Sequence, residues 1–182
     1  MNLIYRKATS KDIEPIAQLH ARSWQQTYRG IYTDNYLDNE VVNDRQSVWK
    51  ERLTSPTPNQ CVLVATDETS TIKGFVSVYG DQDPQWGALV DNLHVQAEIK
   101  GQGVGAALLI KAADHIKQEF PLSGMFLWVY EANSHATAFY ERLGGLKQEL
   151  VKTQIKGKDP ANTLRYIWTK GHFPKHHVQN EQ

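Results

Sequence analysis

Three glycines spaced two residues apart, Gly101, Gly103 and Gly105, follow an apolar run that ends at Val95. Glycine leaves the backbone uncovered, and the first N–H groups of a helix have no intrahelical acceptor. A phosphate can therefore accept several hydrogen bonds at such a turn and lie at the positive end of the helix dipole. A tight turn alone needs only one or two glycines, and a third in the first helical turn costs about 1 kcal/mol relative to alanine. The spacing favours an anion-binding strand–turn–helix over a turn without a ligand.

Two known phosphate-binding patterns match this segment poorly. A P-loop needs Lys and Ser or Thr directly after its last glycine, and Ala106-Ala107 follow here, so this pattern is excluded. A dinucleotide-binding fingerprint fits Gly101-x-Gly103-x-x-Ala106, and Glu131 after the next apolar run is a candidate for its ribose acid. In that fingerprint the first glycine closes the strand itself, whereas residues 96–100 separate the strand from Gly101 here. The dinucleotide interpretation therefore stays open but weak.

A third pattern fits both the glycines and a second segment. The stretch Lys100-Gly101-Gln102-Gly103-Val104-Gly105 resembles the acetyl-CoA signature of the GNAT (Gcn5-related) N-acetyltransferases, Gln/Arg-x-x-Gly-x-Gly/Ala. The stretch 133–144 resembles that family's Asn-x-x-Ala-x-x-Phe-Tyr-x-x-x-Gly, with Asn133, Ala136, Phe139, Tyr140 and Gly144 in place. The second motif follows the first across one predicted strand, and this order favours the GNAT family over a dinucleotide enzyme.

The resemblance implies transfer of an acetyl group from acetyl-CoA to a primary amine acceptor, by direct attack in a ternary complex. The amides of Gly101, Gln102, Gly103, Val104, Gly105 and Ala106, helped by Lys100, are expected to bind the pyrophosphate. The strand backbone at Leu93, His94 and Val95 is expected to pair with the pantetheine arm, which Asn133 also binds, and an amide near Val95 polarises the thioester. Lys100 replaces the family's Gln or Arg, which keeps a positive charge but loses a planar head with several donors.

Two side chains are candidates for proton transfer within the same resemblance. Asp91 is the only charge in the apolar strand 88–95, and we expect it to act as the general base or to anchor a water chain, although many family members carry a Glu where Leu89 stands. Strict alternation would place Asp91 with Leu93 on one face and His94 on the other, unless a bulge intervenes. Tyr140 is expected to protonate the departing thiolate. The structural alternatives are a hydrogen-bonded core acid and a packing tyrosine.

The elements that must position these residues follow from periodicity and breakers. Strands are predicted at 4–8, 61–66, 72–79, 88–95, 125–130, 146–155 and 163–168, and helices from Asp12 to near Arg29 and over 41–52, 104–120 and 134–143. The strand–helix–strand unit 88–130 implies a parallel pair. We therefore expect a mixed α/β (α+β) GNAT fold, with a twisted sheet of about seven strands, helices on both faces, and acetyl-CoA where strands 88–95 and 125–130 diverge.

The connecting regions give weaker signals. Trp24, Tyr28, Tyr32 and Tyr36 recur every four residues, and the resemblance implies that this region forms one wall of the acceptor site. Aromatic packing between two helices is the alternative. The polar segment 80–87 is expected to be a solvated connector, with a place at the rim of the acceptor pocket as the minority interpretation.

The composition limits the class of protein. A length of 182 residues suits a single domain over 1–182, with 171–182 as a flexible tail. Twenty Lys and Arg balance twenty Asp and Glu, which argues against nucleic-acid and anionic-membrane partners. Without a segment long enough to span a bilayer we expect a cytoplasmic monomer or homodimer. Cys61 predicts a structural thiol, and the His-rich segment 172–177 lacks the partners of a metal site. A non-catalytic acetyl-CoA-binding module remains an alternative function.

Overall fold

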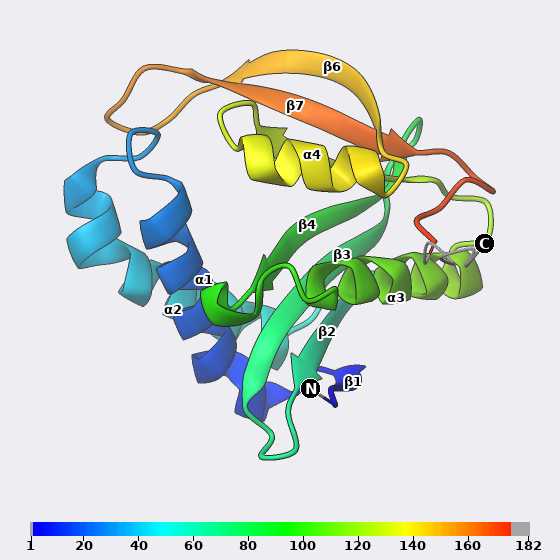
Figure 1. The fold of residues 1–182 in the computed structure, drawn as a ribbon, viewed down its shortest axis with the longest axis horizontal. Coiled ribbons are helices and arrows are strands. Elements are labelled where there is room, and N and C mark those ends of the chain that lie inside the picture. The colour runs from blue at the N-terminus through cyan, green and yellow to red at the C-terminus, as the bar shows by residue number, and fades with distance from the viewer. Residues whose placement is uncertain (1, 176–182) are drawn as a thin grey trace, which may run out of the picture.

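The structure is a computed structural model, which describes residues 2–175. Within these residues seven strands form one mixed sheet in the order β1-β2-β3-β4-β5-β7-β6 (Figure 1). The strands are β1 (Ile4–Lys7), β2 (Gln60–Thr66), β3 (Ile72–Asp83), β4 (Gly87–Val95), β5 (Met125–Tyr130), β6 (Leu146–Thr153) and β7 (Ala161–Trp168). All neighbouring pairs are antiparallel except β4 and β5, which are parallel. The mixed α/β class and the number of strands are confirmed.

Helices cover both faces of the sheet. They are α1 (Ile13–Thr27), α2 (Val41–Thr54), α3 (Val104–Glu119) and α4 (Ser134–Arg142). Residues of α1 and α2 pack with β2 and β3 in one core, which includes Ile16, Trp49 and Phe75. The larger core on the other face contains α3 residues such as Leu108 and strand residues such as Leu127. None of the helices in residues 2–175 has the length and apolar composition that a bilayer crossing requires.

The first helix begins where the sequence predicts. Asp12 is the N-cap residue of α1, so Pro15 lies at the third helical position, where its missing N–H has no cost. The Asp12 carboxylate accepts hydrogen bonds from Arg6 and from the Thr9 amide, which together hold its pKa below the ordinary value. A hydrogen-bonded acid thus ties β1 to the start of α1.

Strands β4 and β5 separate soon after they meet. Their register contains two Cα pairs, Ala88 with Met125 and Leu89 with Phe126. From Val90 to Val95, β4 pairs with β3 on one side and has no strand partner on the other. The expected divergence is therefore observed, and it leaves a length of β4 edge available to an extended ligand.

A β-bulge in β4 overturns the predicted face of Asp91. In the register with β3, Asn92 pairs with Ser77 and Val90 pairs with Val78, so Asp91 is the extra residue. Asp91 consequently points toward α2, where it meets Arg52, while Leu93 packs in the core on the α3 side. The prediction that Asp91 and Leu93 share a face was wrong, because alternation holds only where each residue has a partner.

The polar segment 80–87 is mostly strand. β3 continues to Asp83, and β4 starts at Gly87 opposite it, which leaves a three-residue turn at 84–86. The predicted solvated connector was therefore too long. β6 ends at Thr153 rather than at residue 155.

Candidate active site

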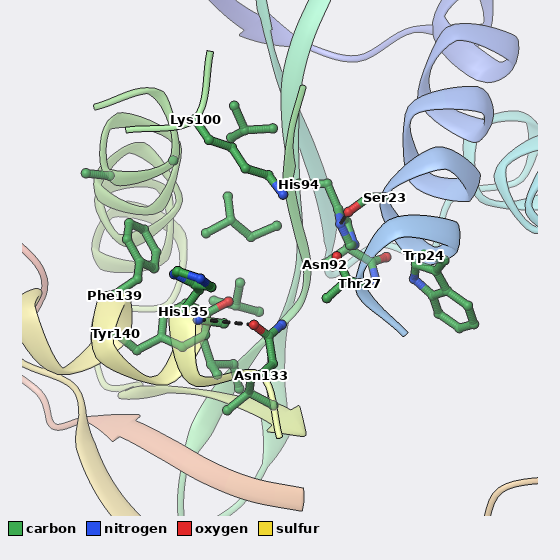
Figure 2. Close-up of a pocket in the computed structure, with 18 of the residues that line it drawn as sticks. Ser23, Trp24, Thr27, Asn92, His94, Lys100, Asn133, His135, Phe139 and Tyr140 are labelled. Atoms are coloured by element: carbon green, nitrogen blue, oxygen red, sulfur yellow. Dashed lines mark hydrogen bonds between the residues drawn. The ribbon is translucent and has the colours of Figure 1, made fainter. Parts of the chain in front are cut away.

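A cavity of about 1510 Å³ opens where β4 and β5 diverge. Its walls come from α1, α2, β4, β5, α4 and the turn before α3 (Figure 2). All the residues predicted for the site line this cavity except Gln102 and Val104: Asp91, Leu93, His94, Val95, Lys100, Gly101, Gly103, Gly105, Ala106, Asn133 and Tyr140. The side chain of Val104 lies in the core instead, with 4% exposure.

The glycine turn exposes amides at the start of α3. Gly101 and Gly103 both have φ of +82°, and a Cβ at either position would meet nothing within 4 Å. The amide of Ala107 donates the first hydrogen bond of α3, to the Gly103 carbonyl at 2.9 Å. The amides of residues 104–106 precede it, and no side chain caps them. Two left-handed glycines therefore present uncovered donors to open space, as the spacing predicts.

Lys100 and Asn133 border the same space. The exposed Lys100 side chain extends beside β4 in Figure 2. Asn133 precedes α4, and its Oδ1 accepts a hydrogen bond from the Ala136 amide at 3.2 Å. This bond fixes the side chain and leaves Nδ2 as a donor for a ligand.

Tyr140 projects from α4 next to its neighbour Phe139, whose ring centroid lies 5.2 Å away. Its hydroxyl makes no hydrogen bond to any residue of the described part of the chain, although the residue lines the cavity. Burial raises its pKa well above the ordinary value, so the phenol carries its proton at neutral pH. The hydroxyl is thus a proton donor without a competing acceptor.

Asp91 is joined to Arg52 of α2. Nη1 of Arg52 donates to Oδ2 of Asp91 at 2.7 Å and to Oδ1 of Asn92 at 2.8 Å. The guanidinium also lies 5.3 Å from the ring centroid of Trp49. A base at Asp91 must therefore act beside the positively charged guanidinium of Arg52.

The side chain of His94 faces α1. Its Nδ1 lies 2.8 Å from Oγ of Ser23, and its ring stacks 4.5 Å from that of His20. Burial lowers the pKa of His94 to about 3, with a further contribution from the Lys100 charge, so the imidazole is neutral at pH 7. Its backbone belongs to the unpaired β4 edge, and its side chain packs against α1.

The periodic aromatic residues form one cluster. The ring of Trp24 lies 5.3 Å from Tyr28 and 5.0 Å from Tyr32, and Tyr32 contacts Tyr36 at 5.6 Å. The helix ends at Thr27, and Tyr32 lies in the connection after it, whereas Tyr36 begins a π-helical turn (Tyr36–Glu40) that leads into α2. Trp24 and Tyr28 therefore pack with other aromatic residues and also line the cavity, while their place in an acceptor site stays a prediction.

Several cavity residues were not predicted. Arg45 and Arg52 come from α2, and Ser23, Asn92 and His135 come from α1, β4 and α4. A signal existed for the two arginines, because they fall at helical spacing on the same face as Val41 and the buried Trp49. Arginine on an apolar helical face has a partner or a ligand, since a buried charge must be paired.

No group of three or more His, Cys, Asp or Glu within residues 2–175 is arranged to hold a metal ion. His176 and His177 of the predicted tail lie outside the described residues.

Comparisons with known proteins agree with these features. The model of the acetyltransferase (GNAT) family matches residues 16–145. The uncharacterized N-acetyltransferase YuaI of Bacillus subtilis is 34% identical over 139 residues, or 75% of this chain and 76% of that protein. The spermidine N(1)-acetyltransferase of Thermoplasma acidophilum is 24% identical over 146 residues, or 79% and 88% of the two chains.

Solved structures share the fold. The crystal structure of the PaiA N-acetyltransferase from Thermoplasma acidophilum in complex with coenzyme A superposes with a TM-score of 0.68 at 24% identity, over 90% of this chain and 98% of that chain. That of Arabidopsis thaliana NAA60 with a bisubstrate analogue gives 0.70 at 16% identity, over 94% and 99%. The matched family model includes the glycine turn, the divergent strands and all of α4, and the chain belongs to the GNAT acetyltransferase family.

Proposed function

We propose that this protein transfers an acetyl group from acetyl-CoA to a primary amine, by direct attack in a ternary complex. The observation that carries the proposal is the continuity of one cavity, which runs from the uncovered amides at Gly103, along the unpaired edge of β4, to the free hydroxyl of Tyr140. A ligand with an anionic end, an extended arm and a leaving thiolate matches these three features in that order.

The cofactor half follows from the backbone. The amides from Gly101 to Ala106 would bind the pyrophosphate, and Lys100 would add a positive charge. The pantetheine arm would pair with β4 at Leu93, His94 and Val95 as an additional strand does, with Nδ2 of Asn133 as a side-chain donor. An amide near Val95 would then stabilise the oxyanion that forms at the thioester carbonyl.

Two proton transfers complete the reaction. An amine with the pKa of a lysine side chain, about 10, is mostly protonated at neutral pH and must lose a proton before it attacks. Asp91, which is hydrogen-bonded to Arg52, would accept this proton directly or through water. The C–N bond forms, the C–S bond breaks, and Tyr140 would donate its proton to the thiolate of coenzyme A.

The acceptor is an amine of a small molecule or of a peptide. The relatives named for spermidine acetylation support an amine acceptor in general. The equal numbers of acidic and basic residues argue against a nucleic-acid or anionic-membrane partner, and the protein proposed here is a cytoplasmic monomer or homodimer.

Ligand binding separates this proposal from its two rivals. At a hundred times its dissociation constant, acetyl-CoA should stabilise the protein by about 2.7 kcal/mol in a thermal-shift assay, and NAD should not. An amine screen with acetyl-CoA, followed by release of free thiol, then tests catalysis. Stabilisation by NAD instead would favour the dinucleotide enzyme, and acetyl-CoA binding without turnover of any amine would favour a binding module.

A further inference from the structure

Two arginines occupy the wall of the cavity opposite the cofactor turn. Arg45 and Arg52 both project from α2 into the cavity lining, next to Trp24 and Asp91. Asp91 is the only carboxylate among the described residues that line the cavity, and Arg52 already binds it at 2.7 Å. Of the charged side chains that line the cavity at α2 and β4, two are therefore positive and one is negative.

Arg45 is held in place by two contacts, and most of its N–H groups have no hydrogen-bond partner among the described residues. Its guanidinium lies over the ring of Trp24, 4.5 Å from the centroid, and Nη2 donates to Oδ2 of Asp44 at 2.9 Å. Asp44 is not among the residues that line the cavity, and it also accepts a hydrogen bond from Tyr36. Nε of Arg45 is buried without a partner among the described residues, and the side chain is only 14% exposed.

This arrangement suits an anionic group on the acceptor. A stacked guanidinium loses little further freedom when it binds a carboxylate, and its planar fork matches the two carboxylate oxygens. Nη1 of Arg45 makes no hydrogen bond to a described residue and, unlike Nε, is not fully buried, so it is a donor that a ligand carboxylate can use. The arginine next to the aromatic wall is therefore a preformed carboxylate site.

The same arrangement disfavours a polyamine. A polyamine brings further ammonium groups besides the one that reacts, and each needs an anionic or aromatic partner when it is desolvated. The one lining carboxylate is already paired, and Arg45 and Arg52 would repel an additional cation.

We propose that the acceptor is a primary amine that also carries a carboxylate, which Arg45 binds with the charge of Arg52 nearby. This inference rests on the proposed acetyltransfer and specifies the substrate class of the same site. It distinguishes this chain from the Thermoplasma relative, whose name gives spermidine as its substrate.

Matched pairs of amines test the inference on the wild-type protein. The kcat/KM for acetylation is compared between lysine and cadaverine and between phenylalanine and phenethylamine, each pair differing only in the carboxylate, with glutamate, glycylglycine and spermidine as further acceptors. We expect the carboxylate-bearing member to be preferred by about tenfold or more, since a hydrogen bond to a charged group contributes roughly that factor. Equal or better turnover of cadaverine, phenethylamine or spermidine would overturn the inference.

Three variants assign the preference to Arg45. Arg45→Gln should lower the preference by about tenfold, mainly through KM for the carboxylate-bearing acceptor. Arg45→Lys should keep part of it, because the charge remains and the fork is lost. Arg22→Gln, the same change at an exposed arginine of α1 outside the cavity lining, should leave the preference at the wild-type value.

Failure of the inference and failure of the proposed function look different. If acetyl-CoA neither stabilises the protein nor acetylates any amine, the proposed function fails and the inference fails with it. If acetyl-CoA binds and only carboxylate-free amines are acetylated, or no carboxylate-bearing member of the panel is, the acetyl-CoA site stands and the inference is wrong. A preference that survives unchanged in a folded Arg45→Gln protein also contradicts it.

Discussion

The Gly103→Val variant distinguishes loss of pyrophosphate binding at the glycine turn from loss of stability through backbone strain. Gly103 has φ of +82° and precedes the first turn of α3, and a Cβ there would meet nothing within 4 Å. The Cβ of a valine at this position would therefore meet no atom of the described residues within 4 Å, although the positive φ strains the backbone. We expect the branched side chain to occupy open space beside the amides of residues 104–106, where the pyrophosphate is proposed to bind.

Two magnitudes follow from this geometry. A left-handed conformation costs a non-glycine residue roughly 1–2 kcal/mol, which in a protein of this size lowers Tm by roughly 2–8 °C. Loss of one charge-assisted hydrogen bond to the pyrophosphate costs about 1.5–3 kcal/mol, which is at least about tenfold in affinity. We expect Gly103→Val to remain folded and to bind acetyl-CoA at least about tenfold more weakly.

A matched glycine supplies the control. Gly171, in the turn after β7, has φ of +85° and nothing within 4 Å of its Cβ position, and it does not line the cavity. Gly171→Val should show a comparable loss of Tm with no change in affinity. Isothermal titration calorimetry with acetyl-CoA and a thermal melt of the apo protein measure the two quantities for each variant.

The refuting result is specific. Wild-type affinity for acetyl-CoA in folded Gly103→Val would mean that the amides of residues 104–106 do not bind the pyrophosphate. An equal loss of affinity in both variants would instead attribute the effect to general destabilisation. Only a loss confined to Gly103→Val supports the turn as the phosphate site.

Further predictions concern Tyr140, Asp91 and His94. Tyr140→Phe should lower kcat by about 10²–10⁴-fold with little change in the acetyl-CoA dissociation constant, and turnover within about twofold of wild type on a verified acceptor would make Tyr140 structural. Asp91→Asn should lower kcat at neutral pH, and kcat should recover in part as rising pH deprotonates the acceptor. If Arg52→Gln causes the same loss of kcat at every pH, Asp91 holds Arg52 in place and does not act as a base. The pKa of His94 is about 3 in the folded protein and about 6.5 when unfolded. The contribution of neutral His94 to the free energy of unfolding should therefore be fully present above pH 6.5. It should decline by up to about 1.4 kcal/mol per pH unit as pH falls toward 3. Chemical denaturation at several pH values would show whether His94→Gln flattens this decline, and an unchanged slope would assign it to other groups.

The sequence predicts the local elements and the cofactor turn because their causes are local. Glycines at 101 and 103 are the residues that adopt positive φ without strain, and both have φ of +82°. The start of α1 after Asp12 and its end before Gly30 also follow from neighbouring residues, although the Asp12 carboxylate bonds to Thr9 and does not cap the helix. The parallel relation of β4 and β5 follows from the helix between them.

Tertiary structure decided the acceptor side of the cavity. The bulge at Asp91 depends on the register of β4 against β3. The alternation of residues within β4 alone gives no information about this register. It turned Asp91 toward α2, to a hydrogen bond with Arg52 across 39 positions of sequence. The two arginines of α2 fit a helical period, but only the packing of α2 beside α1 brings Arg45 over Trp24. The backbone conformation of the glycine turn is determined by adjacent residues and can therefore be predicted from the sequence. Contacts between side chains of separate elements depend on the packing of the whole chain.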